Sequence, residues 1–176
     1  TIVVDHHEVF RHVYEKGFNE INLFHVDAHC DLYPASNPWY YYEYANKSVQ
    51  ERTEIALGNS GKMTEGNYIG FLLGSELLSK VEFITNFDNN WHRDETRMYF
   101  KNFDTNGGVL QLAQGQGEHD PLLITYDDLI KFCSFVGPEV PYSRVNYPDF
   151  QYLLRLRHFL LSWMWKLVLE LQTELN

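Results

Sequence analysis

The first thirty residues contain two short apolar runs separated by a helical pattern, and this order constrains the fold more than any other feature. Thr1–Val4 is β-branched and ends at Asp5, and Ile21–Val26 is apolar enough to be buried on both faces. Between them, apolar residues from Glu8 to Lys16 recur at helical spacing, and Gly17 is placed to end the helix. The pattern predicts a βαβ unit, whose two parallel strands end at the same edge of a sheet.

Two further strands are expected to extend this sheet, the first of them preceded by a helix. A helix is predicted over Glu65–Leu78, and the apolar run Val81–Thr85 after it predicts a strand. Leu122–Thr125 predicts another core strand, which is followed by Asp127. Together with the βαβ unit, these segments predict an α/β fold, a three-layer αβα arrangement with a mainly parallel sheet, in a single domain over residues 1–176.

A hairpin is expected beside this parallel sheet. Asn106-Gly107 is the strongest short sequence signal for a two-residue β-hairpin loop, and it lies between two strand-like segments, Met98–Phe103 and Val109–Gln114. We therefore predict a small antiparallel excursion here.

The last segment, Asp149–Leu175, follows a helical period throughout and predicts one long C-terminal helix. Phe159, Trp163 and Trp165 lie outside its main apolar stripe, so much of the circumference is apolar. We expect a partner subunit to cover part of this surface, which makes the chain a homo-oligomer. Charged residues bracket Phe159–Trp165, a run far below the ~20 residues that a membrane span requires, so no membrane segment is expected.

The chain is acidic, with 24 Asp and Glu against 14 Lys and Arg and a formal net charge of −10. This balance argues against a nucleic-acid partner, because a polyanion would be repelled, and it suits a cation or a small cationic substrate. The two cysteines, Cys30 and Cys133, indicate neither a disulfide framework nor a zinc site of paired thiolates. With no export signal visible, a reducing, cytoplasmic location is expected.

A group of side chains typical of metal sites follows the second apolar run. Asp27, His29 and Asp31 occupy every second position, so in extended backbone all three point the same way. Two carboxylates and an imidazole suit a divalent metal, most of all Mn²⁺, with Zn²⁺ or Fe²⁺ as alternatives. A capped loop would explain any one of these residues alone. Three potential ligands at alternating positions, beside a first strand that ends in Asp-His-His, favour a metal site.

The neighbouring histidines are expected to have different roles. His6 and His7 are adjacent and do not easily face one point, so one of them at most is a ligand, and we assign that role to His6. His7, His12 and His25 are interpreted as packed histidines or as supports for a ligand.

The stretch Asp27-Ala28-His29-Cys30-Asp31 resembles the Asp-x-His-x-Asp metal motif of the arginase, agmatinase and deacetylase superfamily, and Asp5-His6 resembles its upstream Asp-His turn. The chain is most similar to the uncharacterised arginase-like family, in which a His-x-Glu stretch (here His6-His7-Glu8) precedes a His-x-Asp-x-His-x-Asp-Leu run (here His25 to Leu32). Glu65–Phe83 resembles that family's connection from helix to strand. The resemblance covers the first half of the chain and implies an arginase/deacetylase-like fold.

This resemblance implies a hydrolase that cleaves a non-peptide C–N bond, of the guanidinium, amidine or amide type, with metal-bound hydroxide. It assigns four metal ligands in the first half of the chain: His6, Asp27, His29 and Asp31. Asp27 would ligate or bridge, and His25, as the nearby histidine, would shuttle protons. The superfamily's second motif, Ser-x-Asp-x-Asp, has no clean copy here; Asp127 is the expected substitute ligand, with different spacing, and Asp88 is a weaker one.

Two other hypotheses stay open. Val3-Val4-Asp5-His6-His7 resembles the Asp-His-His motif of manganese phosphoesterases, although those enzymes place acidic motifs before it and only Thr1–Val4 precede it here. The second hypothesis is a degenerate, non-catalytic arginase-like domain that keeps the first metal motif and uses its C-terminal helix for binding or assembly.

Overall fold

The described part of the chain forms one mixed sheet with three helices against it. The computed structural model describes residues 5–27, 29–32, 44–58, 62–85, 100–104, 107–115, 133–146 and 148. The strands are β1 (Ile21–Val26), β2 (Leu78–Thr85), β3 (Phe100–Asp104), β4 (Gly107–Gly115) and β5 (Cys133–Asn146), and the helices are α1 (Glu8–Glu15), α3 (Val49–Leu57) and α4 (Tyr68–Gly74). The strand order is β1-β2-β5-β4-β3. The predicted α/β class is confirmed.

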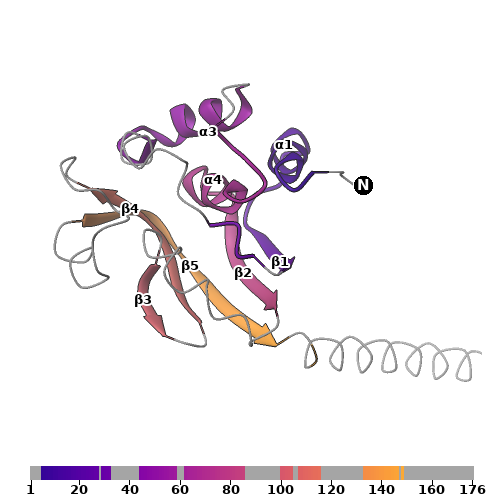
Figure 1. Ribbon diagram of the computed structural model, residues 1–176. Coiled ribbons are helices and arrows are strands. Elements are labelled where there is room, and N and C mark those ends of the chain that lie inside the picture. The colour runs from indigo at the N-terminus through magenta and orange to yellow at the C-terminus, as the bar shows by residue number, and fades with distance from the viewer. Residues whose placement is uncertain are drawn as a thin grey trace, which may run out of the picture.

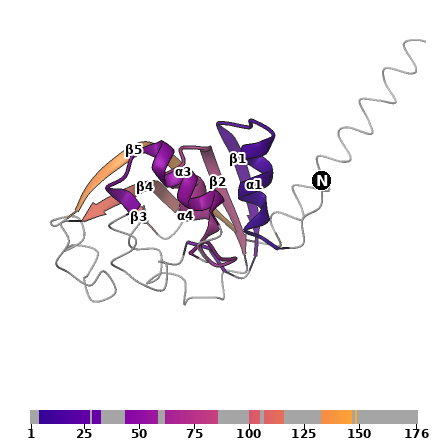
Figure 2. The same cartoon turned by 90° about the horizontal axis from the view of Figure 1, so that it is seen from above.

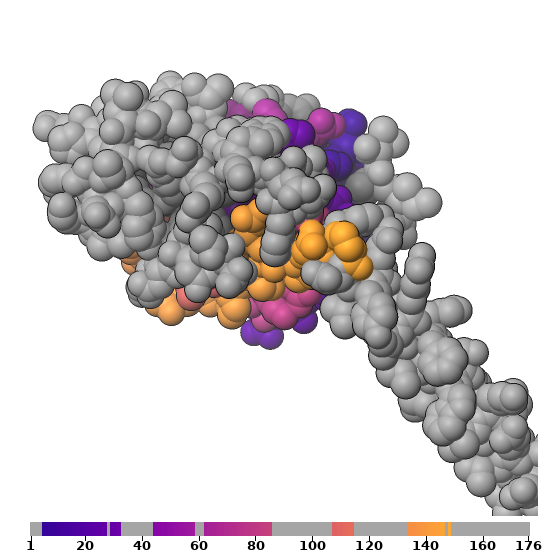
Figure 3. Space-filling view, turned by 60° about the horizontal axis from the view of Figure 1, so that its bottom comes forward, coloured from indigo at the N-terminus to yellow at the C-terminus, as the bar shows by residue number. Residues whose placement is uncertain are grey.

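The three helices cover one face of the sheet, as Figure 1 and Figure 2 show from two directions. The core lies between the two layers, where Phe10 of α1, Leu72 of α4 and Phe83 of β2 belong to one buried cluster. Figure 3 brings the underside of Figure 1 forward and shows atoms of β2 and β5 at the surface. The described residues form two layers, and the second helical layer of the expected αβα arrangement is not among them.

The sheet is mixed, not mainly parallel as expected. β1 pairs in parallel with β2, and β2 pairs in parallel with β5. β4 is antiparallel to both β3 and β5. The predicted hairpin is confirmed, because Asp104 of β3 pairs with Gly107 of β4 across the turn. It is no excursion, however: β4 pairs along β5 and so belongs to the same sheet.

β5 was not predicted, because Gly137, Pro138 and Pro141 interrupt its sequence and proline argues against a central strand. Pairing with β2 begins only at Tyr142, so both prolines lie outside the part of β5 that pairs with β2. Gly137 has φ +77, and its carbonyl accepts a hydrogen bond from Gln111 Nε2 at 2.9 Å, near a register shift between the strands. A bulge therefore lets this strand tolerate residues that usually end one.

The helix predicted after the first strand is confirmed as α1. Gly17 has φ +67, the conformation that glycine adopts without a Cβ penalty. The amide of Phe18 donates to the carbonyl of Val13 at 3.1 Å, and that of Gly17 donates to Tyr14 at 3.0 Å. These two bonds form a Schellman motif, which ends the helix and turns the chain into β1.

The crossover from β1 to β2 passes through α3 and α4, and its second helix is shorter than predicted. The pattern over Glu65–Leu78 predicted one helix, whereas α4 covers only Tyr68–Gly74. Glu76 takes up a left-handed conformation, with φ +57, and this ends the helix. β2 consequently begins at Leu78, three residues before the predicted strand Val81–Thr85.

Three predicted elements lie outside the described residues: the strands Thr1–Val4 and Leu122–Thr125 and the helix Asp149–Leu175. The homo-oligomer contact assigned to that helix lies outside them too. Among the described helices, none has the length and apolar character needed to cross a membrane.

The turn into β4 generates a stability prediction. A Cβ on Gly107 would lie 2.3 Å from the carbonyl oxygen of Tyr142, whereas a Cβ on Gly17 would meet nothing within 4 Å. Gly17→Ala should therefore cost only the left-handed backbone penalty, about 1–2 kcal/mol. Gly107→Ala should lower the free energy of unfolding by about 1–3 kcal/mol more, because the backbone of β4 or of Tyr142 must move to admit the methyl group. Urea unfolding of the full chain measures both; equal losses would contradict the close packing of β4 on β5.

Candidate metal centre

The segment that carries the candidate ligands begins where β1 ends. The amide of Asp27 donates to the carbonyl of Ile84 at 3.2 Å and continues the ladder between β1 and β2. The backbone then turns, because the amide of His29 donates to Asp27 Oδ1 at 2.9 Å and Asp31 has φ +50. The extended backbone assumed for this motif therefore ends at Val26. What brings side chains together beyond it is a turn, not strand alternation.

Three of the predicted ligands converge at this edge of the sheet. His6 lies in the turn before α1, and its Nδ1 is 3.1 Å from Asp31 Oδ2 and 3.7 Å from Asp27 Oδ2. One ligand atom from each residue lies within 4.8 Å of the other two. The side chain of His6 is 49% exposed, that of Asp27 20% and that of Asp31 5%. The group is thus open to solvent on the His6 side and closed beneath Asp31.

His29 is not part of this group. Its Nδ1 lies 3.4 Å from Oδ1 of Asp27, the oxygen other than the one nearest His6, and its side chain is 48% exposed. Its assignment as a ligand stays a prediction. Asp127 and Asp88 lie outside the described residues, so the source of a further carboxylate also stays a prediction.

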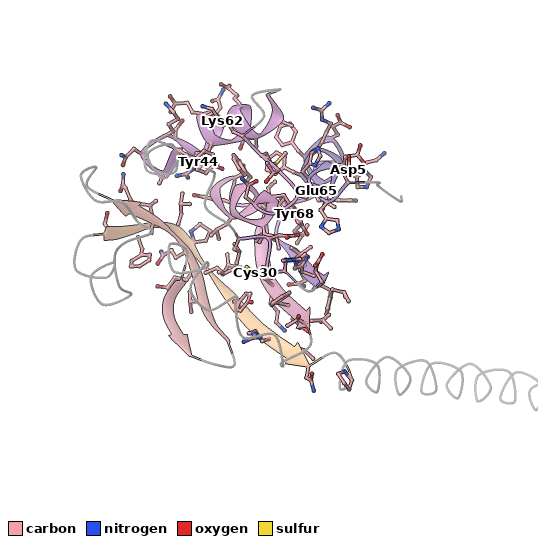
Figure 4. All side chains as sticks on the ribbon, viewed as in Figure 1. Asp5, Cys30, Tyr44, Lys62, Glu65 and Tyr68 are labelled. Carbon is pink, nitrogen blue, oxygen red and sulfur yellow. The ribbon has the colours of Figure 1, made fainter. Side chains whose placement is uncertain are left out.

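A buried pair of side chains lies next to the group. His25 Nε2 is 2.8 Å from the carbonyl oxygen of His29 and 3.4 Å from Asp31 Oδ2. On the other side of the ring, Nδ1 lies 3.2 Å from the hydroxyl of Tyr68, the first residue of α4. Figure 4 shows Tyr68 at α4, above the segment that carries Cys30. Both ring nitrogens of His25 therefore face protein groups, and its role as a proton shuttle stays a prediction.

Tyr68 was not predicted as a site residue. The available signal was a tyrosine in an otherwise apolar helix, since a buried tyrosine hydroxyl usually has a hydrogen-bond partner. Which partner it has depends on the packing of α4 against β1, and the sequence does not reveal that packing.

The two carboxyl groups of the site differ in their electrostatic surroundings. Burial raises the pKa of Asp31, and His25 and the hydrogen bond from His6 offset this only in part. Burial also acts to raise the pKa of Asp27, but the hydrogen bonds from His29 and the nearby His25 outweigh it and leave this pKa below its usual value. Asp27 is therefore the more readily ionised of the two carboxyls.

The buried pair is neutral at pH 7. Burial lowers the pKa of His25, although Asp31 and the carbonyl of His29 act against this. Burial raises the pKa of Tyr68 far above its usual value, and the carboxylates of Asp31 and Asp27 raise it further. Tyr68 consequently keeps its proton, and His25 carries one proton on its ring.

A second group of ligand atoms lies at the start of α1. Asp5, His7 and Glu65 each offer one atom within 4.8 Å of the other two. Figure 4 shows Asp5 and Glu65 at this end of the helix. His6 and His7 thus turn toward different pairs of carboxylates, which is consistent with the expectation that only one of them joins Asp27 and Asp31.

No protein-family model and no curated protein matches this chain. The resemblance to the arginase-like family therefore depends on the motif residues alone. The donor set fits a divalent cation on its own chemistry, because one imidazole and two carboxylates with an open side are ligands that Mn²⁺, Fe²⁺ and Zn²⁺ accept in proteins. His6, Asp27 and Asp31 are the residues that would hold it.

The strain and charge at Asp31 generate a prediction for the metal-free chain. Asp31→Asn removes a buried carboxylate from beside Asp27 and keeps an oxygen that accepts hydrogen bonds, and asparagine tolerates φ +50 well. The free energy of unfolding should change by less than about 1 kcal/mol, or rise. Asp31→Ala should lower it by about 1–3 kcal/mol through backbone strain. Denaturant unfolding with a chelator present compares the two, and equal losses would contradict this account.

Proposed function

We propose that this chain is a metal-dependent hydrolase and that His6, Asp27 and Asp31 hold its divalent cation. Mn²⁺ is the first candidate, with Zn²⁺ and Fe²⁺ as alternatives. The observation that carries the proposal is the contact between His6 and Asp31, which are 25 positions apart, at a point where a second carboxylate also arrives. Two carboxylates and an imidazole at one point are a donor set that a divalent cation can hold, and the cation would offset the repulsion between the carboxylates.

The residues around the cation would have separate tasks in catalysis. A divalent ion would supply a water molecule of lowered pKa, which is a nucleophile near neutral pH. Asp27 is ionised and partly exposed, so it would act as a ligand and as the acceptor of a proton from that water. Asp31 is buried, is hydrogen-bonded to His6 and lies 3.4 Å from the ring of His25, which suits a ligand of fixed position. His6 is half exposed and leaves a side open for a substrate.

The substrate class we propose is a small molecule with a non-peptide C–N bond of the guanidinium, amidine or amide type. Support comes from the likeness of Asp27–Asp31 to the superfamily's motif and from the charge of the chain. Guanidinium and amidine groups are cationic, and a chain of net charge −10 attracts them.

Metal binding is the first test. Isothermal titration with Mn²⁺ should detect an ion bound by the wild-type chain, and Asp27→Asn should weaken it more than about 100-fold, beyond the usual effect of losing a supporting residue. Glu65→Gln is the matched control, because it removes one carboxylate from the other cluster, at the start of α1. Loss of Mn²⁺ binding in Glu65→Gln but not in Asp27→Asn would show that the ion binds at the other cluster and would contradict the proposal.

Turnover is the second test. With Mn²⁺ bound, the wild-type chain should release ammonia, urea or an amine from at least one member of a panel of guanidino, amidine and linear amide compounds, and Asp27→Asn should not. A phosphate ester panel is run beside it. Metal binding without turnover on either panel would favour the non-catalytic domain, and turnover of phosphate esters alone would favour the Asp-His-His phosphoesterase hypothesis.

A further inference from the structure

We propose that Tyr68 is a positioning residue of the metal centre and that it acts through His25 on the loop carrying Asp27 and Asp31. This inference rests on the proposed function, because it concerns how tightly that loop holds its ion. It goes beyond the motif, since Tyr68 lies on α4, in a part of the chain that contributes no predicted ligand.

The hydrogen bonds define one arrangement of protons. The carbonyl oxygen of His29 can only accept, so the 2.8 Å contact requires a proton on His25 Nε2. In a neutral imidazole the other nitrogen, Nδ1, is then an acceptor, and the hydroxyl of Tyr68 donates to it at 3.2 Å. The order from α4 inward is therefore Tyr68 hydroxyl, His25 ring and His29 carbonyl. Each donor has an acceptor, and the ring is held in one tautomer and one orientation.

This arrangement acts on the ligand loop directly. The His29 carbonyl belongs to the segment between Asp27 and Asp31, so its bond to His25 fixes the backbone between two candidate ligands. The same ring nitrogen lies 3.4 Å from Asp31 Oδ2, so the ring also lies against that carboxylate. Groups that orient ligands in this way usually affect metal affinity strongly, although they do not touch the ion.

Tyr68 is itself held rigidly, as a positioning residue must be. It is 3% exposed, and its ring makes edge contacts with the rings of both His25 and His6. The residue before it, Asn67, is also buried, and its side chain accepts from the amide of Thr64 and donates to the carbonyl of Lys62. These hydrogen bonds fix the turn that leads into α4, and so they fix the position of Tyr68 at the start of the helix.

Tyr68→Phe removes the hydroxyl and keeps the ring. His25 Nδ1 is then left in a buried place without its donor, so one of the two hydrogen bonds that hold the ring is lost and the ring is free to rotate, which weakens the bond to the His29 carbonyl. The Mn²⁺ dissociation constant should rise about 10-fold or more, the lower end of the range for supporting residues.

Tyr44→Phe is the matched control. Tyr44 is also buried, at 2% exposure, and its hydroxyl also contacts α4, but there it bonds the carbonyl of Phe71 and not the site. Both substitutions should lower stability by a similar small amount, which urea unfolding measures. Only Tyr68→Phe should weaken Mn²⁺ binding in titration calorimetry.

Nitrogen-15 NMR of the histidine rings reports the tautomer of His25, which a simple loss of stability would not change. In the metal-free wild-type chain, His25 should show the tautomer protonated at Nε2, and Tyr68→Phe should change the shifts of both its nitrogens while Tyr44→Phe leaves them unchanged. Unchanged His25 shifts and an unchanged Mn²⁺ dissociation constant in Tyr68→Phe would overturn this inference. A wild-type chain that binds no Mn²⁺ would instead overturn the proposed function, so the two failures are distinguishable.

Discussion

The meeting of Asp27 and Asp31 at the carboxyl end of β1 is the constraint on which the rest of this site depends. Two negative charges within 4.8 Å, at an effective dielectric constant of ~20, repel by about 3 kcal/mol, a large share of the stability of a domain this size. In the metal-free chain the hydrogen bond between His6 and Asp31 offsets part of this cost. A divalent cation between the two carboxylates would offset this repulsion.

The fold places this pair through backbone geometry. β1 and β2 are parallel, so their carboxyl ends lie on the same side of the sheet. Ligands of α/β sheets bind at the carboxyl ends of the strands, and Asp27 and Asp31 follow the carboxyl end of β1. The left-handed conformation of Asp31 then brings its side chain back toward Asp27. From the helical layer, α1 begins just after His6, and α4 presents Tyr68 to His25. One parallel strand pair and the two helices beside it therefore bring these side chains together.

Much of this site could be predicted from the sequence, but its geometry could not. The apolar run Ile21–Val26 predicted β1 with its observed bounds, and the acidic and imidazole residues after it predicted the convergence of His6, Asp27 and Asp31. The position of the His29 side chain depends on the turn between Asp27 and Asp31. The two-residue alternation of side chains in a strand does not apply to a turn. Strand alternation therefore predicted that Asp27, His29 and Asp31 all point the same way, whereas only Asp27 and Asp31 meet.

The larger differences have similar causes. β5 was missed because a bulge at Gly137 accommodates prolines, and without β5 the hairpin seemed separate from the sheet. α3 was missed although Ser48 and Glu51 form a capping box, a signature that is visible in the sequence. Local patterns thus predicted the elements with regular periodicity. Bulges, and the tertiary contact that pairs Tyr68 with His25, depend on which elements become neighbours.

The central claim is that a divalent cation binds between His6, Asp27 and Asp31, and anomalous diffraction from crystals grown with Mn²⁺ tests it most directly. The account predicts an anomalous peak about 2.0–2.4 Å from the imidazole of His6 and from a carboxylate oxygen of each aspartate. A fully occupied peak elsewhere, with these three side chains unchanged and no density between them, would contradict it.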